Sequence, residues 1–190
     1  EGELTIGALK IDKFGAAAMF GINNPDTEAN ELEAYLAATV GAKFQKYRLE
    51  GGLFLGRTCT LAPLEMVDPD VASLVGQAPF TGGYAYAEGW FPIYNAGCAF
   101  NVTLGAGVGV FYFAEGPTWG GRLFGAVSGE ALCLLQIGGS LNLVGLKAGD
   151  DFRFKGTGNV FGSIGPCDAC VEFNKSIKAT YLNGDWDIDY

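Results

Sequence analysis

Hydrophobic and polar residues alternate with a period of two over much of the chain. From Val171 to Tyr181 one set of alternate positions is apolar except for Lys175, and the other set carries Glu, Asn, Ser, Lys and Thr. From Phe100 to Tyr112 one set is again apolar, and glycines fill much of the other. This period predicts half-buried β-strands in both segments. The glycine face of the second strand predicts close approach by another backbone or an aromatic ring.

A long stretch in the middle of the chain is apolar on both sets of alternate positions. It runs from Leu123 to Leu146 and is broken into pieces by glycines. We expect it to form central strands that are covered on both faces. Ala148–Asp151 and Asn183–Gly184 are turn signals, and the second suits a two-residue hairpin loop.

Helical signals are few. One short helix is predicted over residues 68–75, with Asp68 as N-cap and Pro69 at the first helical position. Glu28–Ala38 has helical propensity, but Leu36–Val40 equally suits a strand. The pattern therefore predicts an all-β fold, a long antiparallel meander that forms a barrel or sandwich. At 190 residues, a single β domain over residues 1–190 is expected.

A weak internal repeat organises the glycines. Segments with a glycine, an aromatic residue, a further glycine and a cysteine end at Cys59, Cys98, Cys133 and Cys167. The cysteines lie 34 to 39 residues apart, a spacing typical of units of two to four strands. The alternative is that Gly (30 residues) and Phe (14 residues) are simply abundant.

Composition narrows the function classes. With 49% hydrophobic and 17% charged residues, the chain is suited to a packed fold and not to disorder. A net charge of −9 disfavours nucleic acid and anionic lipid surfaces as partners. The absence of histidine removes the commonest general base and metal ligand. No phosphate-binding loop and no GxSxG motif occurs, so we expect no enzyme activity and no cofactor.

The five cysteines are the candidate structural thiols or disulfide partners. They are Cys59, Cys98, Cys133, Cys167 and Cys170. The last two form a CxxC motif, but the βαβ pattern of a thioredoxin-like enzyme is missing, and a zinc site would need a second close pair. Structural roles are therefore favoured, with metal binding and redox catalysis as alternatives.

Carboxylates provide the remaining candidate chemistry. Asp185, Asp187 and Asp189 share one face of a C-terminal strand and form a weak carboxylate cluster. Such a cluster suits calcium, but a calcium loop bends around its ion, and a charged edge that deters aggregation is favoured. A catalytic carboxylate pair would draw on the three glutamates in strand-like apolar surroundings, which are Glu88, Glu115 and Glu130. The favoured interpretation is that each lies at a strand end or pairs with an arginine such as Arg122 or Arg153.

The favoured interpretation is a non-enzymatic structural or interaction domain. It would be a segment of a larger, repetitive or assembled protein, with protein partners or copies of itself held through sheet surfaces and edges. One alternative is a β-barrel or β-sandwich that binds a lipid or another apolar ligand. A further alternative is a small outer-membrane β-barrel, suggested by the alternating strands and the Trp186-x-Ile188-x-Tyr190 pattern.

Location is only weakly indicated. No apolar run approaches the ~20 residues of a membrane-spanning helix, so no membrane is expected. The chain opens on Glu1-Gly2-Glu3, without the pattern of a secretory leader, and this does not settle the compartment. An extracytoplasmic or secreted setting is weakly favoured.

Overall fold

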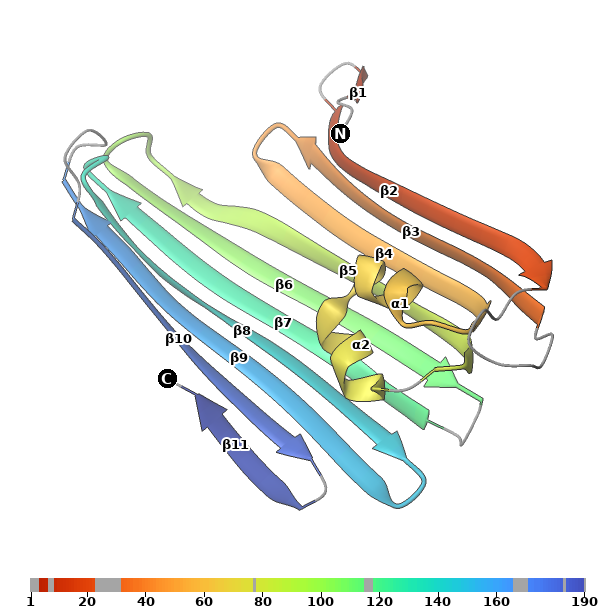
Figure 1. Ribbon diagram of the computed structural model, residues 1–190. Coiled ribbons are helices and arrows are strands. Elements are labelled where there is room, and N and C mark those ends of the chain that lie inside the picture. Colours follow the sequence, from red (N-terminus) through yellow and green to blue (C-terminus); the bar gives the residue numbers. More distant parts are fainter. Residues whose placement is uncertain are drawn as a thin grey trace.

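A single antiparallel sheet makes up most of the molecule. The computed structural model describes residues 4–6, 9–22, 32–76, 78–114, 118–165, 171–182 and 184–189. The strands follow one another in sequence order across an 11-stranded sheet (Figure 1). They are β1 (Leu4–Ile6), β2 (Leu9–Ile22), β3 (Leu32–Phe44), β4 (Tyr47–Thr58), β5 (Phe80–Asn95), β6 (Phe100–Phe113), β7 (Thr118–Ala131), β8 (Leu135–Ala148), β9 (Asp151–Ile164), β10 (Val171–Leu182) and β11 (Asp185–Asp189).

The predicted all-β antiparallel meander is confirmed. Strands β6 and β10 cover the two segments with the clearest alternation, and a turn at residues 149–150 joins β8 to β9. A helix over Glu28–Ala38 is wrong from Leu32 onward, because β3 begins there; residues 28–31 lie outside the described part of the chain. The helical propensity of these residues is overridden by strand pairing, since β3 is hydrogen-bonded to β2 and to β4.

Two short helices connect β4 to β5. They are α1 (Ala62–Val67) and α2 (Pro69–Val75). The second is the predicted helix, and the Asp68 carboxylate accepts hydrogen bonds from the backbone N–H groups of Asp70 (3.0 Å) and Val71 (3.1 Å). In the described chain, neither helix has the length and hydropathy needed to cross a membrane.

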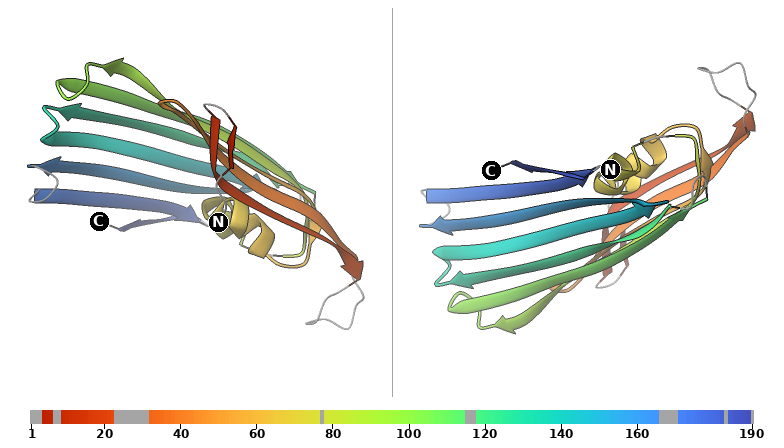
Figure 2. Two further views of the ribbon diagram at one scale, coloured as in Figure 1. Left: turned by 90° about the horizontal axis from the view of Figure 1, so that it is seen from above. Right: turned by 90° about the horizontal axis from the view of Figure 1, so that it is seen from below.

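The sheet curves around the helix pair, which lies on its concave side (Figure 2). Helix α1 contacts β3 and β4, and α2 contacts β8 and β9. The buried core lies between the helices and the concave face. Its members are Ala37, Phe54, Leu64, Val67, Val71, Ala72, Leu74, Phe80, Tyr84, Phe111, Phe113, Val144 and Leu146.

The expectation of central strands covered on both faces is wrong. The segment 123–146 contains most of β7 and β8, which are interrupted at 132–134. The helices bury Val144 on the concave face, but Leu123 and Leu141 on the opposite face are exposed. The sheet forms one layer, and the helix pair covers only one side of it.

The two edges of the sheet are only partly covered by strands. Strand β1 pairs with residues 9–11 of β2, and β11 pairs with residues 178–182 of β10. Because β1 and β11 lie at opposite ends of the strand order, the sheet is open among the described residues.

Candidate functional site

The convex face of the sheet exposes many large apolar side chains. Paired residues on neighbouring antiparallel strands share a face, so the registers assign each side chain to one side. Large apolar residues that the registers place on the convex face and that are exposed are Phe14, Phe20, Ile22, Leu32, Leu36, Val40, Phe44, Tyr47, Leu49, Leu53, Leu55, Phe91, Tyr94, Phe100, Leu104, Val108, Val110, Tyr112, Trp119, Leu123, Val127, Leu135, Ile137, Leu141, Phe152, Val160, Ile164, Val171, Phe173, Ile177, Trp186 and Ile188. We call this surface the apolar face.

The paired positions of the apolar face contain no carboxylate in the described strands. Glycine and alanine fill most positions between the large side chains, as in the row Ala106, Gly125 and Leu141. The charged side chains on this face are the cations Arg57, Lys147 and Lys175. Although the protein has a net charge of −9, the paired positions on this side of the described strands hold no acidic residue.

Aromatic side chains gather at both ends of the apolar face. Even-numbered strands begin at one end of the sheet, which we call the disulfide rim, and end at the other, the helix rim. At the helix rim, Tyr181 lies 5.1 Å from Trp186 and 6.5 Å from Phe152 between ring centroids. At the disulfide rim, the ring centroids of Tyr94 and Phe100 are 5.9 Å apart. The aliphatic and small residues lie between these rows.

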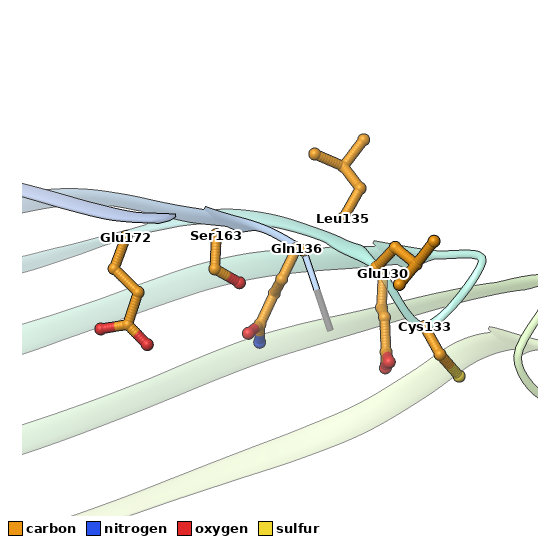
Figure 3. A pocket seen from close by; sticks show the side chains of 8 residues that line it. Glu130, Cys133, Leu135, Gln136, Ser163 and Glu172 are labelled. Atoms are coloured by element: carbon orange, nitrogen blue, oxygen red, sulfur yellow. The ribbon is translucent and has the colours of Figure 1, made fainter. Parts of the chain in front are cut away.

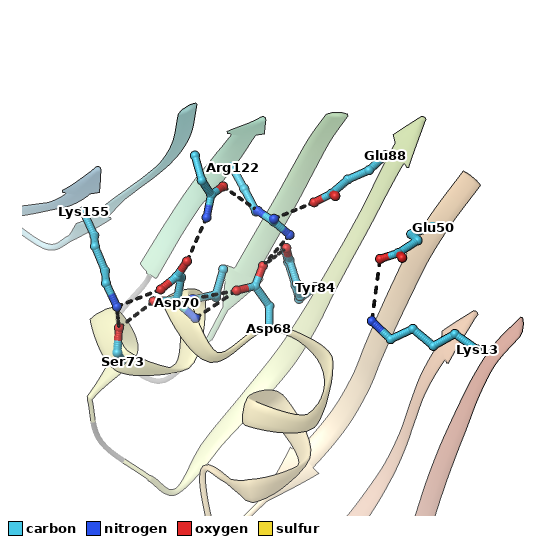
Figure 4. A network of polar contacts seen from close by, with 11 residues as sticks. Lys13, Glu50, Asp68, Asp70, Ser73, Tyr84, Glu88, Arg122 and Lys155 are labelled. Atoms are coloured by element: carbon cyan, nitrogen blue, oxygen red, sulfur yellow. Dashed lines mark hydrogen bonds and ion pairs between the residues drawn. The ribbon is translucent and has the colours of Figure 1, made fainter. Parts of the chain in front are cut away.

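The concave face carries a buried ion cluster beside the apolar core (Figure 4). Asp68, at the start of α2, is 3% exposed and accepts a hydrogen bond from the Tyr84 hydroxyl at 2.5 Å. The Arg122 guanidinium of β7 lies 3.1 Å from the same carboxylate oxygen. A second nitrogen of Arg122 lies 2.5 Å from the Glu88 carboxylate of β5. One guanidinium thus pairs with two buried carboxylates from different elements, and it also lies over the Tyr86 ring.

Further polar contacts fix α2 to the C-terminal half of the sheet. Asn142 of β8 donates to Asp70 at 2.8 Å and accepts from Arg122 at 2.8 Å. The Lys155 ammonium of β9 lies 2.8 Å from Asp70. Arg153 donates to the backbone carbonyl of Leu74 at 2.9 Å. The helix pair is therefore attached to β5, β7, β8 and β9 by side chains that are far apart in sequence.

A shallow cavity of about 220 Å³ opens at the disulfide rim. Glu130, Gln136, Ser163 and Glu172 point to one side of the sheet there, whereas Leu135 points to the other (Figure 3). The two carboxylates come from β7 and β10. The charged residues that line this cavity, Glu130 and Glu172, are both acidic.

The cysteines occupy different parts of the structure. Cys98 and Cys133 form a disulfide that joins the β5–β6 turn to the β7–β8 turn at the disulfide rim. Cys59 directly follows β4 at the helix rim, where its backbone N–H donates to Glu33 at 3.1 Å. Cys167 and Cys170 lie outside the described residues. Two of the cysteines in the predicted repeat thus hold equivalent turns, and Cys59 does not.

The carboxylates singled out by sequence do not converge. Asp185, Asp187 and Asp189 are exposed along β11, and in the described part of the chain no three Cys, Asp or Glu residues lie close enough to hold a metal ion. Glu88 belongs to the ion cluster, and Glu130 lines the cavity at the other rim. Glu115 lies outside the described residues.

Sequence reasoning did not identify Asp70 or Asn142 as members of a site. Arg122, in contrast, was expected as a partner for glutamates such as Glu88, and its guanidinium does lie 2.5 Å from the Glu88 carboxylate. Asp68 was predicted as an N-cap, but the residues next to it in the sequence do not indicate that its carboxylate binds an arginine 54 residues away. The sequence showed that apolar residues alternate along the strands. It did not show that these residues lie on the convex face, because it does not say which face the helices cover.

Comparison of the chain with models of protein families, with curated proteins and with solved structures finds no match.

Proposed function

We propose that this sheet is a wall segment of a membrane-embedded β-barrel. Its apolar face contacts lipid acyl chains, and its concave face lines the interior together with α1 and α2. The proposal keeps the expected non-enzymatic, structural role within a larger assembly and specifies a bilayer as its surroundings. The observation that carries it is a continuous apolar face without a carboxylate, bordered by aromatic side chains at both ends.

The dimensions of the apolar face suit a bilayer. On β6 the convex positions run from Phe100 to Tyr112 without a polar residue. At about 3.4 Å per residue this segment is roughly 40 Å long. A strand tilt of about 45° projects it to roughly 30 Å, which is the thickness of the hydrocarbon core.

The aromatic residues at the two rims and the polar residues of the concave face also support a bilayer as the surroundings of the sheet. Tyr and Trp prefer the two interfaces of a bilayer, where an apolar ring body and a polar tip are both satisfied. Alternation of apolar outward and polar inward residues is the pattern of lipid-embedded strands. The buried Asp68–Arg122–Glu88 cluster lies on the inward side, away from acyl chains.

The extent of the face favours lipid over a small apolar ligand. Each strand adds about 4.8 Å of width, so the described strands make a surface far larger than the 300–600 Å² apolar patch of an ordinary monomer. A bound ligand would need a concavity, whereas the registers place these side chains on the face opposite to the helix pair, and the helix pair lies on the concave side of the sheet (Figure 2). The alternative is that a protein partner covers the apolar face, and vesicle binding distinguishes a protein partner from lipid.

The three tryptophans provide the test. Trp119 is on the apolar face and is 58% exposed, whereas Trp90 is on the concave face, packed at 5.3 Å against the Phe124 ring. We would refold a Trp119-only chain (Trp90→Phe, Trp186→Phe) and a Trp90-only chain (Trp119→Phe, Trp186→Phe) into phosphatidylcholine vesicles. Both should float with the vesicles, and lipids brominated on their acyl chains should quench Trp119 strongly and Trp90 weakly.

The Trp119-only and Trp90-only chains compare the two faces of the same sheet. Failure of both chains to float, although circular dichroism shows β structure, would remove the proposal and favour a protein partner for the apolar face. Equal quenching of the two tryptophans would also contradict it, because the two faces would then not differ in contact with lipid.

A further inference from the structure

The two edge strands of the sheet, β2 and β10, are each covered by a short strand along only part of their length. On its outer side β2 pairs with β1 only at residues 9–11, and no other strand of the described chain covers 13–22. On its outer side β10 pairs with β11 only at residues 178–182, and no other described strand covers 173–177. In a bilayer such edges must be paired, since hydrocarbon offers no hydrogen bonds. The inference that follows rests on the proposed function in this respect.

Strand direction makes the two edges fit each other. Strands β2 and β10 run in the same direction, because every pairing between them is antiparallel and they differ by an even number of strands. Strand β1 therefore lies at the disulfide rim, beside the start of β2, and β11 lies at the helix rim, beside the end of β10. Where one edge is covered, the other is uncovered. Strand β11 has the correct direction to pair with the uncovered helix-rim part of β2, and β1 has the correct direction for β10.

Side chains on both faces agree with this pairing. On the polar face β11 carries only the carboxylates Asp185, Asp187 and Asp189. The uncovered part of β2 begins with Lys13, which is 52% exposed although its ammonium lies 3.6 Å from Glu50. On the other face, Trp186 and Ile188 of β11 would continue the apolar surface of β2.

We propose that a second copy of this chain completes the wall. The five residues of β11 in one copy pair within the helix-rim part of residues 13–22 of β2 in the other, and the three residues of β1 in that other copy pair within residues 173–177 of β10. Within one chain the two edges lie on opposite sides of the sheet (Figure 1). A two-fold axis along the interior makes both junctions identical and closes the ring. Both copies then direct their helix pairs inward.

Interchain cross-linking tests the junction. In a Cys59→Ser, Cys167→Ser, Cys170→Ser background, which keeps the Cys98–Cys133 disulfide, Ala18→Cys on β2 and Ile188→Cys on β11 would be made in separate chains that carry tags of different size. The two chains are refolded together in detergent and treated with a short bifunctional thiol reagent. We expect a heterodimer as the main product. Ala106→Cys, on the apolar face of β6, replaces Ala18→Cys as the matched control and should give less than about a tenth as much heterodimer, because ~4.8 Å per strand places it far from the edge.

The outcomes distinguish pairing with a second copy from pairing within one chain and from unpaired edges. A heterodimer in the Ala18→Cys mixture, with two 20.0 kDa chains per particle by light scattering, supports the second copy. Monomers without cross-links overturn it. A double variant that cross-links within one chain, with no product from the mixture, also overturns it and shows that the chain closes on itself. Vesicle flotation is measured on the same samples. Heterodimers that do not float would contradict the membrane proposal alone, and floating monomers would contradict the second copy alone.

Discussion

At the scale of single residues, Arg122 connects two buried carboxylates on the concave face. It contacts Asp68 and Glu88, which are 3% and 8% exposed, so its removal leaves two carboxylates without a countercharge. Arg122→Met is expected to lower the free energy of unfolding by about 3–5 kcal/mol, the range for breaking a buried ion pair. Urea unfolding followed by tryptophan fluorescence measures it.

The control for Arg122 is Lys155, whose ammonium contacts the more exposed Asp70. Lys155→Met should cost less than about 1 kcal/mol, because partly solvated pairs contribute little. Equal losses for the two variants would show that the cluster behaves as a surface network and not as a buried one.

Gly82 marks a place where the backbone of β5 has no room for a side chain. A Cβ there would lie 2.0 Å from the carbonyl oxygen of Tyr112 and 2.8 Å from the Cα of Phe113, and neither backbone atom can move freely. Gly82→Ala is expected to destabilise the fold by about 1–3 kcal/mol or more. Gly125→Ala, on the open apolar face, has nothing within 4 Å and should be neutral or slightly stabilising in the same assay.

At the scale of elements, the helix pair depends on a few buried side chains. Leu64 of α1 is fully buried against the sheet, whereas Met66 of the same helix is exposed. Leu64→Ala should lower the free energy of unfolding by about 2–5 kcal/mol, and Met66→Ala by much less. Limited proteolysis between residues 59 and 79 should accelerate in the first variant only. Unchanged proteolysis in Leu64→Ala would mean that α1 is not held by this contact.

The elements show how far sequence reasoning reaches. Alternation located β6 and β10, and the Asp68–Pro69 pair located α2, because these signals are local. Helix α1 was missed, since its N-cap Leu61 offers no side-chain hydrogen bond and the helix is only 6 residues long. The strands at 123–146 were predicted as covered on both faces, because apolar residues and glycines occur at both sets of positions. The Arg122–Asp68 contact depends on curvature, which no local pattern encodes.

At the scale of the whole molecule, the two faces of the sheet should respond oppositely to charge. Leu123 lies on the apolar face of β7, and Ser128 lies on the concave face of the same strand. In vesicles, Leu123→Lys is expected to cost about 2–4 kcal/mol of unfolding free energy, as for cations on a lipid-contacting strand face. Ser128→Lys should cost far less, and both variants are compared with the unsubstituted chain by urea unfolding in vesicles. Similar costs on both faces would contradict lipid contact.

The attachment of the helix pair has a consequence for the order of folding. Every strand pairing in the described sheet joins neighbours in sequence, so hairpins can form early and locally. Helix α2, in contrast, is made before β5 is reached along the chain, yet its contacts with Asn142 and Lys155 require β8 and β9. Docking of α2 is therefore a late step that waits for residues synthesised 72 and 82 positions after their partners in the helix. Protection of the α2 amides from hydrogen exchange would report when the C-terminal half of the sheet has joined the rest.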